Sequence, residues 1–159
     1  MSQTLLAFLA FMVATQVAFN QQRAALQSQI QMVNSEVTNL ATSAGLDILT
    51  EISALDFDSA TSGGAVVTDA SNLSSLPFTS GGTFADADDI DDVHEIQTYT
   101  YQTELADISF DVEFEVRYVN EADVSVVENS QTFAKEVVLT LDNPNLFSPI
   151  TISQVYTYP

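Results

Sequence analysis

The sequence predicts an α+β fold in which one long N-terminal α-helix, apolar in its first half and amphipathic in its second, packs on a C-terminal four-stranded antiparallel sheet. Three observations lead to this prediction. The first 22 residues contain no ionisable side chain, apolar residues then recur every three or four positions up to residue 55, and the period falls to two after residue 95. We therefore divide the 159 residues into an apolar helix (1–23), an amphipathic helix (24–56), a loop that is acidic at its end (57–94) and a sheet domain (95–159).

The apolar helix reaches the minimum length for crossing a bilayer. Residues 3–19 contain only a few polar side chains, and about 17 helical residues span the hydrocarbon core. No basic residue precedes this stretch, and Asn20–Arg23 leads into more helix instead of a small-residue cleavage site. We therefore expect the segment to be retained and not removed as a signal peptide. It serves either as a membrane anchor or as a surface that packs against copies of itself, through Leu5, Leu6, Phe8, Leu9, Phe11, Met12, Val13, Val17, Phe19 and Arg23.

The amphipathic helix continues the first one without a break. Neither Gly nor Pro occurs before Gly45, so a single helix of ~80 Å is predicted up to about residue 55. Its apolar stripe consists of Leu26, Ile30, Val33, Val37, Leu40, Ala44, Ile48, Ile52 and Leu55. We expect this stripe to cover the sheet. A chain of 159 residues does not need so long a helix for its own core, so part of the helix must be buried by something else.

The remaining residues alternate between loop and strand patterns. Residues 59–94 are rich in Gly, Ser and Asp, which predicts a loop with a minor strand at 65–67. Strands are predicted at 96–101, 110–118, 132–141 and 150–158. Because apolar and polar residues alternate in them, an antiparallel sheet with one packed and one solvated face is expected.

The composition restricts the function. The chain has 22 acidic residues against three basic ones, Arg23, Arg117 and Lys135, and a net charge of −19. Nucleic-acid binding is excluded because it needs clusters of Lys and Arg. Cysteine is absent and His94 is the single histidine, so thiolate catalysis, zinc sites and iron–sulfur clusters lack their residues. We expect no catalytic residue, no cofactor and no enzymatic activity, and we interpret His94 as a strand-edge residue.

An acidic cluster precedes the sheet. It contains Asp86, Asp88, Asp89, Asp91 and Asp92, followed by Glu95. Two interpretations stay open. Hard cations such as Ca²⁺ bind several oxygens on a flexible loop, although the spacing does not match an EF-hand. Alternatively, the carboxylates cap a short turn or face solvent.

The order of these segments resembles a known family. An apolar N-terminal helix, an amphipathic extension, a loop and a four-stranded antiparallel sheet are similar to a type IV pilin or pseudopilin. The acidic stretch 84–94 also resembles an aspartate-rich stretch of many bacterial prepilin-type proteins. The resemblance implies a structural subunit of an extracellular pilus-like filament, inserted in the membrane before assembly. Its partners would be copies of itself and the pilus or secretion assembly machinery.

Two other functions remain open. The family usually carries a glutamate at the fifth mature position, where this chain has Leu5, and some minor components also lack it. A minor pilin or a membrane-anchored secretion pseudopilin is therefore one alternative, and a single-pass anchored binding domain is another. In a filament, Arg23 is expected to pair with Glu36 or Asp47 of an adjacent subunit.

The acidic residues are unevenly distributed. Of the 22, only Glu36 and Asp47 precede Glu51, so most of the charge would lie outside the neutral helices of a filament. Repulsion between such subunits extends over ~30 Å at 0.01 M salt and ~3 Å at 1 M. We therefore expect assembly to require high salt or divalent cations.

Overall fold

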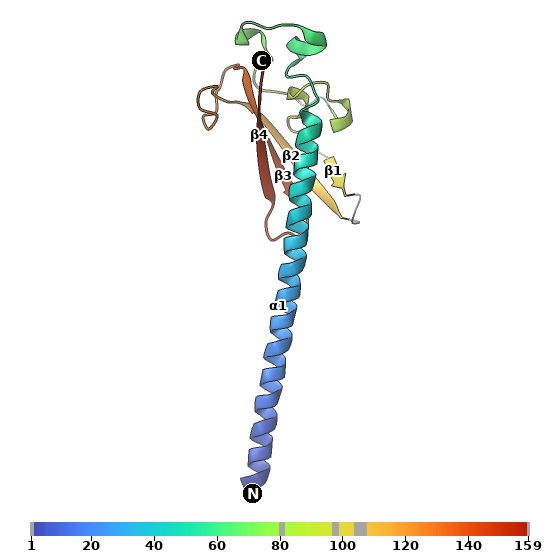
Figure 1. The fold of residues 1–159 in the computed structure, drawn as a ribbon, viewed down its shortest axis with the longest axis vertical. Helices are drawn as coiled ribbons and strands as arrows, with labels where there is room; N and C mark the ends of the chain where they lie inside the picture. The colour runs from blue at the N-terminus through green and yellow to red at the C-terminus, as the bar shows by residue number, and fades with distance from the viewer. Residues whose placement is uncertain (1, 80–81, 97–98, 104–107, 159) are drawn as a thin grey trace. The chain divides into compact units, whose positions relative to one another are not determined.

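The structure is a computed structural model that describes residues 2–79, 82–96, 99–103 and 108–158. Helix α1 spans Ser2–Ile52, and the strands are β1 (Tyr99–Gln102), β2 (Ser109–Tyr118), β3 (Ala134–Asp142) and β4 (Ile150–Thr157), as Figure 1 shows. The loop contains the 3-10 helices η1 (Ser59–Gly64), η2 (Ala70–Asn72), η3 (Phe84–Asp86) and η4 (Asp91–Val93). The predicted α+β class is confirmed.

The sheet is a meander of the order β1-β2-β3-β4, with each strand antiparallel to its neighbour. Phe114 of β2 lies opposite Leu139 of β3, which lies opposite Ile152 of β4. In β2 every second side chain is buried, and these are Phe110, Val112, Phe114, Val116 and Tyr118. This alternation confirms the period of two, since one face of the strand packs and the other faces solvent.

Some element ends differ from the prediction. Helix α1 ends at Ile52, and the next residues form a turn that leads to Asp58, the N-cap of η1. No strand forms at 65–67, so the predicted minor strand there is wrong. Its short apolar run has no neighbouring strand to supply the ladder of hydrogen bonds. Gln97 and Thr98 of the first predicted strand lie outside the described residues.

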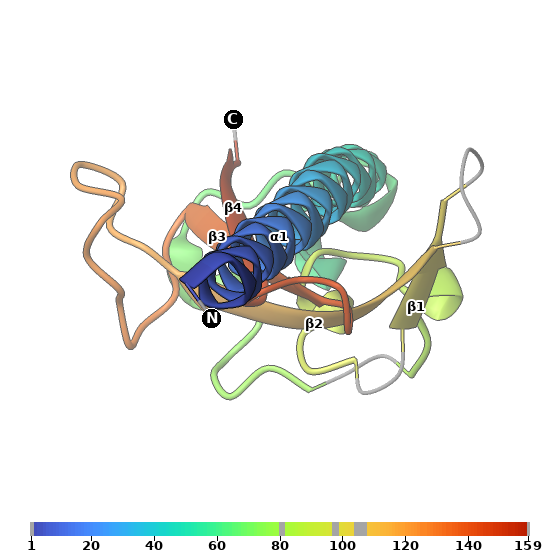
Figure 2. The ribbon, with the colours of Figure 1, turned by 90° about the horizontal axis from the view of Figure 1, so that it is seen from below.

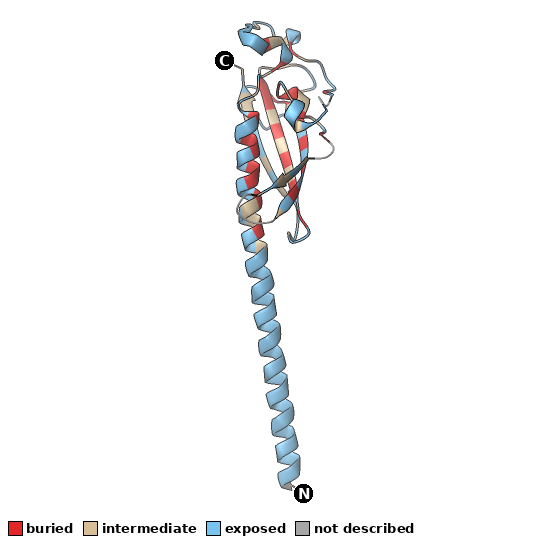
Figure 3. Ribbon diagram, turned by 90° about the vertical axis from the view of Figure 1, so that its right-hand side faces the viewer, coloured by how far each residue is buried: buried red, intermediate tan, exposed pale blue. Residues whose placement is uncertain are grey.

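The chain forms two compact units, residues 1–37 and 38–159, which are described separately. In the second unit the last turns of α1 lie along one face of the sheet (Figure 2). The helix residues buried there are Ala41, Ala44, Ile48, Leu49 and Ile52, and Figure 3 shows this buried stripe in red. In the first unit Leu26, Ile30 and Val33 are exposed. The expectation that the whole stripe from Leu26 covers the sheet is therefore wrong.

Gly45 sets how closely α1 approaches the sheet. A Cβ atom at this position would lie 2.7 Å from Ile152 Cδ1 and 3.2 Å from Leu141 Cδ1. Both distances are shorter than ordinary carbon–carbon contacts, which are near 3.5–4.0 Å. A glycine in the middle of a helix costs about 0.5–1 kcal/mol relative to alanine. Here it lets the helix backbone lie directly against two side chains of the sheet.

Candidate functional site

The apolar part of α1 has no cover within the described chain. All nine apolar side chains predicted to form an interface are exposed, namely Leu5, Leu6, Phe8, Leu9, Phe11, Met12, Val13, Val17 and Phe19. Exposed fractions reach 70% for Leu5 and Phe11. An exposed apolar surface of this extent marks a membrane- or protein-binding surface.

Helix α1 is also long and apolar enough to cross a membrane. The candidate span lies within Gln3–Ile52, and its most apolar stretch is not buried by the rest of the described chain. Signal sequences and the core helices of soluble proteins satisfy the same criteria of length and composition. The helix is therefore consistent with an anchor in a membrane or in a filament.

Arg23 follows the apolar surface. Its side chain is exposed and takes part in none of the ion pairs found among the described residues. The other two cations are engaged. Arg117 contacts Glu136 with Nη2 and Oε2 2.7 Å apart, and Lys135 is buried. Arg23 is thus the cation that remains available for a carboxylate of another molecule.

The five aspartates of the acidic cluster separate into two groups. Asp86 and Asp88 are exposed, and Asp86 accepts a hydrogen bond from Thr83 Oγ1 at 2.6 Å. Asp89 and Asp91 are buried, and Asp92 is partly exposed. Asp89 Oδ1 accepts the backbone N–H groups of Asp91 and Asp92 at 2.9 and 3.2 Å. The cluster therefore acts in part as a turn cap.

The geometry gives the calcium hypothesis no support. Among the described residues, no group of three or more His, Cys, Asp or Glu side chains is placed to share one metal ion. Asp89 directs one oxygen at the backbone N–H groups of Asp91 and Asp92, and Asp91 directs one at Lys135. Calcium binding stays a prediction.

Lys135, Asp58 and Asp91 form a buried ion cluster that the sequence analysis missed. Lys135 and Asp58 are fully buried, and Asp91 is 6% exposed. Lys135 Nζ lies 2.8 Å from Asp58 Oδ2, donates to the carbonyl oxygen of Phe57 at 2.7 Å, and contacts Asp91 Oδ1. The cluster joins β3 to the loop at two places, before η1 and within η4.

Aromatic rings enclose this cluster. Lys135 Nζ lies 4.5 Å from the ring centre of Phe57, 5.5 Å from that of Phe78 and 5.3 Å from that of Tyr118. Tyr118 donates a hydrogen bond from its hydroxyl to the carbonyl oxygen of Ser74 at 2.8 Å. The rings exclude water from the ammonium group and provide cation–π attraction.

The two carboxyl groups of the cluster differ in protonation. Burial raises the pKa of Asp91 to about 6, although the nearby Lys135 ammonium acts in the opposite direction. Burial also acts to raise the pKa of Asp58. Hydrogen bonds from Lys135 and from the backbone N–H groups of Ser74 and Ala60 outweigh it, so that pKa lies below its usual value. Asp58 is therefore the ionised partner of Lys135, and Asp91 takes up a proton more readily.

One signal in the sequence could have located the cluster. Lys135 is in phase with Val137, Leu139 and Leu141, the inward residues of β3. A strict period of two places this lysine on the packed face, where a buried ammonium requires carboxylate partners. Which carboxylates would reach it depends on the loop, whose path the pattern does not predict.

The side chain of His94 contacts both the sheet and the loop. Its Nδ1 accepts the backbone N–H of Val116 at 3.0 Å, and its ring packs edge-on against Phe78. The histidine therefore fastens the end of the loop to β2, which agrees with its interpretation as a strand-edge residue.

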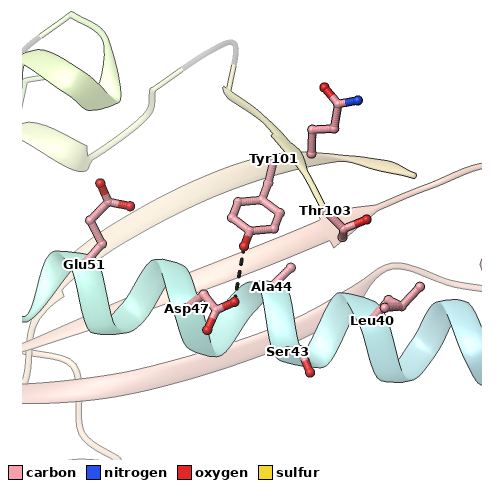
Figure 4. A pocket seen from close by; sticks show the side chains of 8 residues that line it. Leu40, Ser43, Ala44, Asp47, Glu51, Tyr101 and Thr103 are labelled. Carbon is pink, nitrogen blue, oxygen red and sulfur yellow. Dashed lines mark hydrogen bonds between the residues drawn. The ribbon is translucent and has the colours of Figure 1, made fainter. Parts of the chain in front are cut away.

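A groove of about 530 Å³ lies between α1 and β1, lined by Leu40, Ser43, Ala44, Asp47, Glu51, Tyr101, Gln102 and Thr103. Figure 4 shows Tyr101 pointing from the strand to Asp47 on the helix, with its hydroxyl 3.2 Å from Asp47 Oδ2. With Glu51 on the next turn, the described residues of the groove present two carboxylates and no Lys or Arg. The groove suits a positively charged group.

Comparisons with known proteins give no relative. No protein-family profile, no curated protein and no solved structure matches the chain. The architecture is pilin-like. A long apolar N-terminal helix packs its last turns on a four-stranded antiparallel sheet.

Proposed function

We propose that the chain is a structural subunit of an extracellular, type IV pilus-like filament and has no catalytic role. The observation that supports this most is the exposed apolar surface of α1 at residues 5–19. In the filament, copies of this surface pack against one another. Each large apolar side chain kept from water contributes about 1.5–3 kcal/mol, so burial of this surface holds the assembled filament together in aqueous solution.

The exposed stripe beyond residue 23 favours a filament over a simple anchor. Leu26, Ile30 and Val33 follow the bilayer-length segment and remain uncovered. An anchor needs about 20 apolar residues and no further stripe. In a polymer these side chains contact helices of adjacent subunits. Before assembly the same helix lies in the membrane, and the assembly machinery extracts it.

The acidic side chains suit the outside of such a polymer. In β2 the side chains of Asp111, Glu113 and Glu115 alternate with the buried residues and are exposed. The apolar helices would form the core and the sheet domains the shell. Arg23 would pair across subunits with Glu36 or with Asp47 in the groove beside β1.

Electron cryomicroscopy of native surface filaments, with mass spectrometry of their subunit, tests the proposal. We expect this chain as the repeating unit. The substitution Phe8→Glu should abolish assembly, because it places a charge in the apolar core. Phe147→Glu is the matched control, since Phe147 is 72% exposed against 66% for Phe8 but lies in the loop before β4.

Assembly by the Phe8→Glu variant would contradict the packing of this helix in a core. A chain found at a few copies per filament would favour a minor pilin or pseudopilin. A chain found only in the membrane fraction and without crosslinked oligomers would favour the anchored binding domain. The membrane-capable helix is compatible with both alternatives.

A further inference from the structure

The buried ion cluster contains the only lysine of the chain. Lys135 Nζ, Asp58 and Asp91 are removed from solvent and enclosed by Phe57, Phe78 and Tyr118. Three ionisable groups in contact within an apolar enclosure cost desolvation energy that their attraction often fails to offset. Conversion of the lysine–aspartate pair into a neutral amide would remove two of these buried charges.

We propose that Lys135 and Asp58 become joined by an intramolecular isopeptide bond, with Asp91 carrying the proton between the reacting groups. The amine and the carboxyl group that would react are already held together, with Nζ 2.8 Å from Asp58 Oδ2. Groups fixed in contact react as if at a very high effective concentration. The reaction requires no partner chain and is independent of filament formation.

Asp58 is the electrophile because backbone N–H groups bind both of its carboxyl oxygens. Its Oδ1 accepts the backbone N–H of Ala60 at 3.0 Å, and its Oδ2 accepts that of Ser74 at 2.9 Å. The backbone N–H of Asp58 itself donates to Thr61 Oγ1 at 3.1 Å, which fixes the residue as the cap of η1. The two N–H donors can stabilise the negative charge that develops on the carboxyl oxygens during attack.

Asp91 is the proton carrier because it contacts the reacting nitrogen and, unlike Asp58, is not fixed by hydrogen bonds from backbone N–H groups. Its Oδ1 contacts Nζ, and among the described hydrogen bonds no backbone N–H binds either of its carboxyl oxygens. Burial raises the pKa of Asp91 to about 6, so this carboxyl group exchanges a proton near neutral pH. A group with such a pKa serves as acid and base in successive steps.

The reaction is a condensation. The Lys135 ammonium transfers one proton to the Asp91 carboxylate, Asp91 passes that proton to the Asp58 carboxylate, and the neutral amine attacks Cγ of the now neutral Asp58 carboxyl group to form a C–N bond. A second proton leaves the nitrogen, one C–O bond of Asp58 breaks, and the departing oxygen leaves as water after receiving both protons. An ammonium and a carboxylate thus give one amide and one water, and Asp91 returns to its starting state. No oxidant, reductant or cofactor is involved.

A cavity beside Asp91 can receive the released water. This cavity of about 340 Å³ is lined by Ser74, Phe78 and Asp91, together with other residues of the loop. The bond would close a loop between residues 58 and 135 and fasten the start of the loop to β3. In a chain without cysteine, it provides a covalent cross-link that needs no redox chemistry.

The mass and digestion pattern of the full-length wild-type chain test the proposal. We expect an intact mass lower than that of the unbonded chain by one water molecule. After denaturation, a protease that cleaves only after lysine should leave the chain uncut, and amine-reactive reagents should not label Lys135. Peptide mapping should recover a branched peptide that joins residue 58 to residue 135.

A Lys135 that is cleaved and labelled throughout the sample would overturn the proposal and leave an ion cluster. Loss of water at another site, or a bond from Lys135 to Asp91, would overturn it as well. These measurements need no variant, so a folding defect cannot obscure the outcome.

Two variants then test the role of Asp91. Asp91→Asn should slow bond formation by about a hundredfold or more, as expected for loss of an acid–base group. Asp92→Asn is the matched control, since Asp92 also lies in η4 but binds the backbone N–H of Asp88 and makes no ion pair with Lys135. An Asp91→Asn chain that forms the bond as fast as the Asp92→Asn chain would remove Asp91 from the proposal.

Discussion

The hydroxyl group of Tyr156 in β4 donates a hydrogen bond to the backbone carbonyl oxygen of Leu49 in α1, at a distance of 2.7 Å. The same carbonyl oxygen accepts the N–H of Ser53 at 3.0 Å, at the end of the helix. Burial raises the pKa of Tyr156 to about 12, so the hydroxyl keeps its proton at all physiological pH values. The bond therefore links the last turn of α1 to an edge strand of the sheet.

Tyr156→Phe removes this link without changing the ring. We expect a loss of about 1 kcal/mol in the free energy of unfolding, the usual net value of such a hydrogen bond. Tyr101→Phe is the control, because the Tyr101 hydroxyl bonds to the exposed Asp47 and its removal should cost less. Guanidinium unfolding of the full chain, followed by near-ultraviolet circular dichroism, measures both. Equal losses of unfolding free energy in the two variants would mean that burial does not strengthen the hydrogen bond of Tyr156.

Gly45→Ala should destabilise the sheet domain even though alanine favours a helix. The new Cβ meets Ile152 Cδ1, and overpacking of this kind typically costs about 1–3 kcal/mol. Ile152→Val deletes that Cδ1 atom, so the double variant should recover part of the loss. A double-mutant cycle measured by thermal unfolding checks this coupling. Strictly additive effects would show that the contact with Ile152 does not limit the approach of the helix.

Asp91 should titrate well above the usual range of an aspartate in the chain whose Lys135 is not yet joined to Asp58. Its pKa of about 6 lies above the usual value near 3.9, so the folded state binds a proton that the unfolded state releases between these pH values. The contribution of Asp91 to stability is therefore full below pH ~4 and is lost as the pH rises through ~6. Carboxyl ¹³C NMR should show one aspartate with this midpoint, absent in Asp91→Asn. An unshifted Asp91 signal would contradict the effect of its burial.

Filaments of the chain should dissociate in low salt. Each subunit carries a net charge of −19, and at 0.01 M salt the repulsion is screened only beyond ~30 Å. Dialysis against 0.01 M salt with a chelator should release subunits, as measured by sedimentation. Restoration by sodium chloride alone indicates screening, whereas restoration only by millimolar calcium indicates bound cations. Filaments that remain intact would disprove both requirements.

Reversal of the charge at Arg23 should weaken assembly. Arg23→Glu places a carboxylate where we propose an intersubunit pair with Glu36 or Asp47, while Arg23→Lys keeps the charge. We expect the lysine variant to assemble, and the glutamate variant to fail, at the salt concentration at which the wild-type chain assembles. A second substitution, Asp47→Arg or Glu36→Arg, should restore assembly of Arg23→Glu and identify the partner. Normal assembly of Arg23→Glu alone would show that Arg23 faces solvent.

The periodic parts of the chain could be predicted closely from sequence. The alternation in residues 110–118 places β2 and its buried face to within one residue, because strand side chains alternate strictly between the two faces. Helix α1 follows from the spacing of its apolar residues and the lack of Gly and Pro before Gly45. The spacing does not predict what each apolar side chain packs against. Leu26 and Ile48 fit the same stripe, yet Leu26 is exposed and Ile48 is fully buried.

The loop was the least predictable part. Its acidic residues looked alike in sequence, but Asp91 is buried beside Lys135 whereas Asp88 is exposed. This difference arises from long-range packing of η4 against β2 and β3, which local composition does not encode. The isolated bridge between Asp56 and Asp89, which brings the two ends of the loop together, has the same origin.

Burial along α1 begins at Val37, close to the boundary between the two compact units. Residues before this point contribute no buried side chain to the described core, and the sheet core draws on helix residues after it. The two stretches can therefore diverge independently in evolution. The same division allows protein engineers to exchange the residues after Val37 for another domain, so that a foreign module could be displayed on an unchanged N-terminal helix.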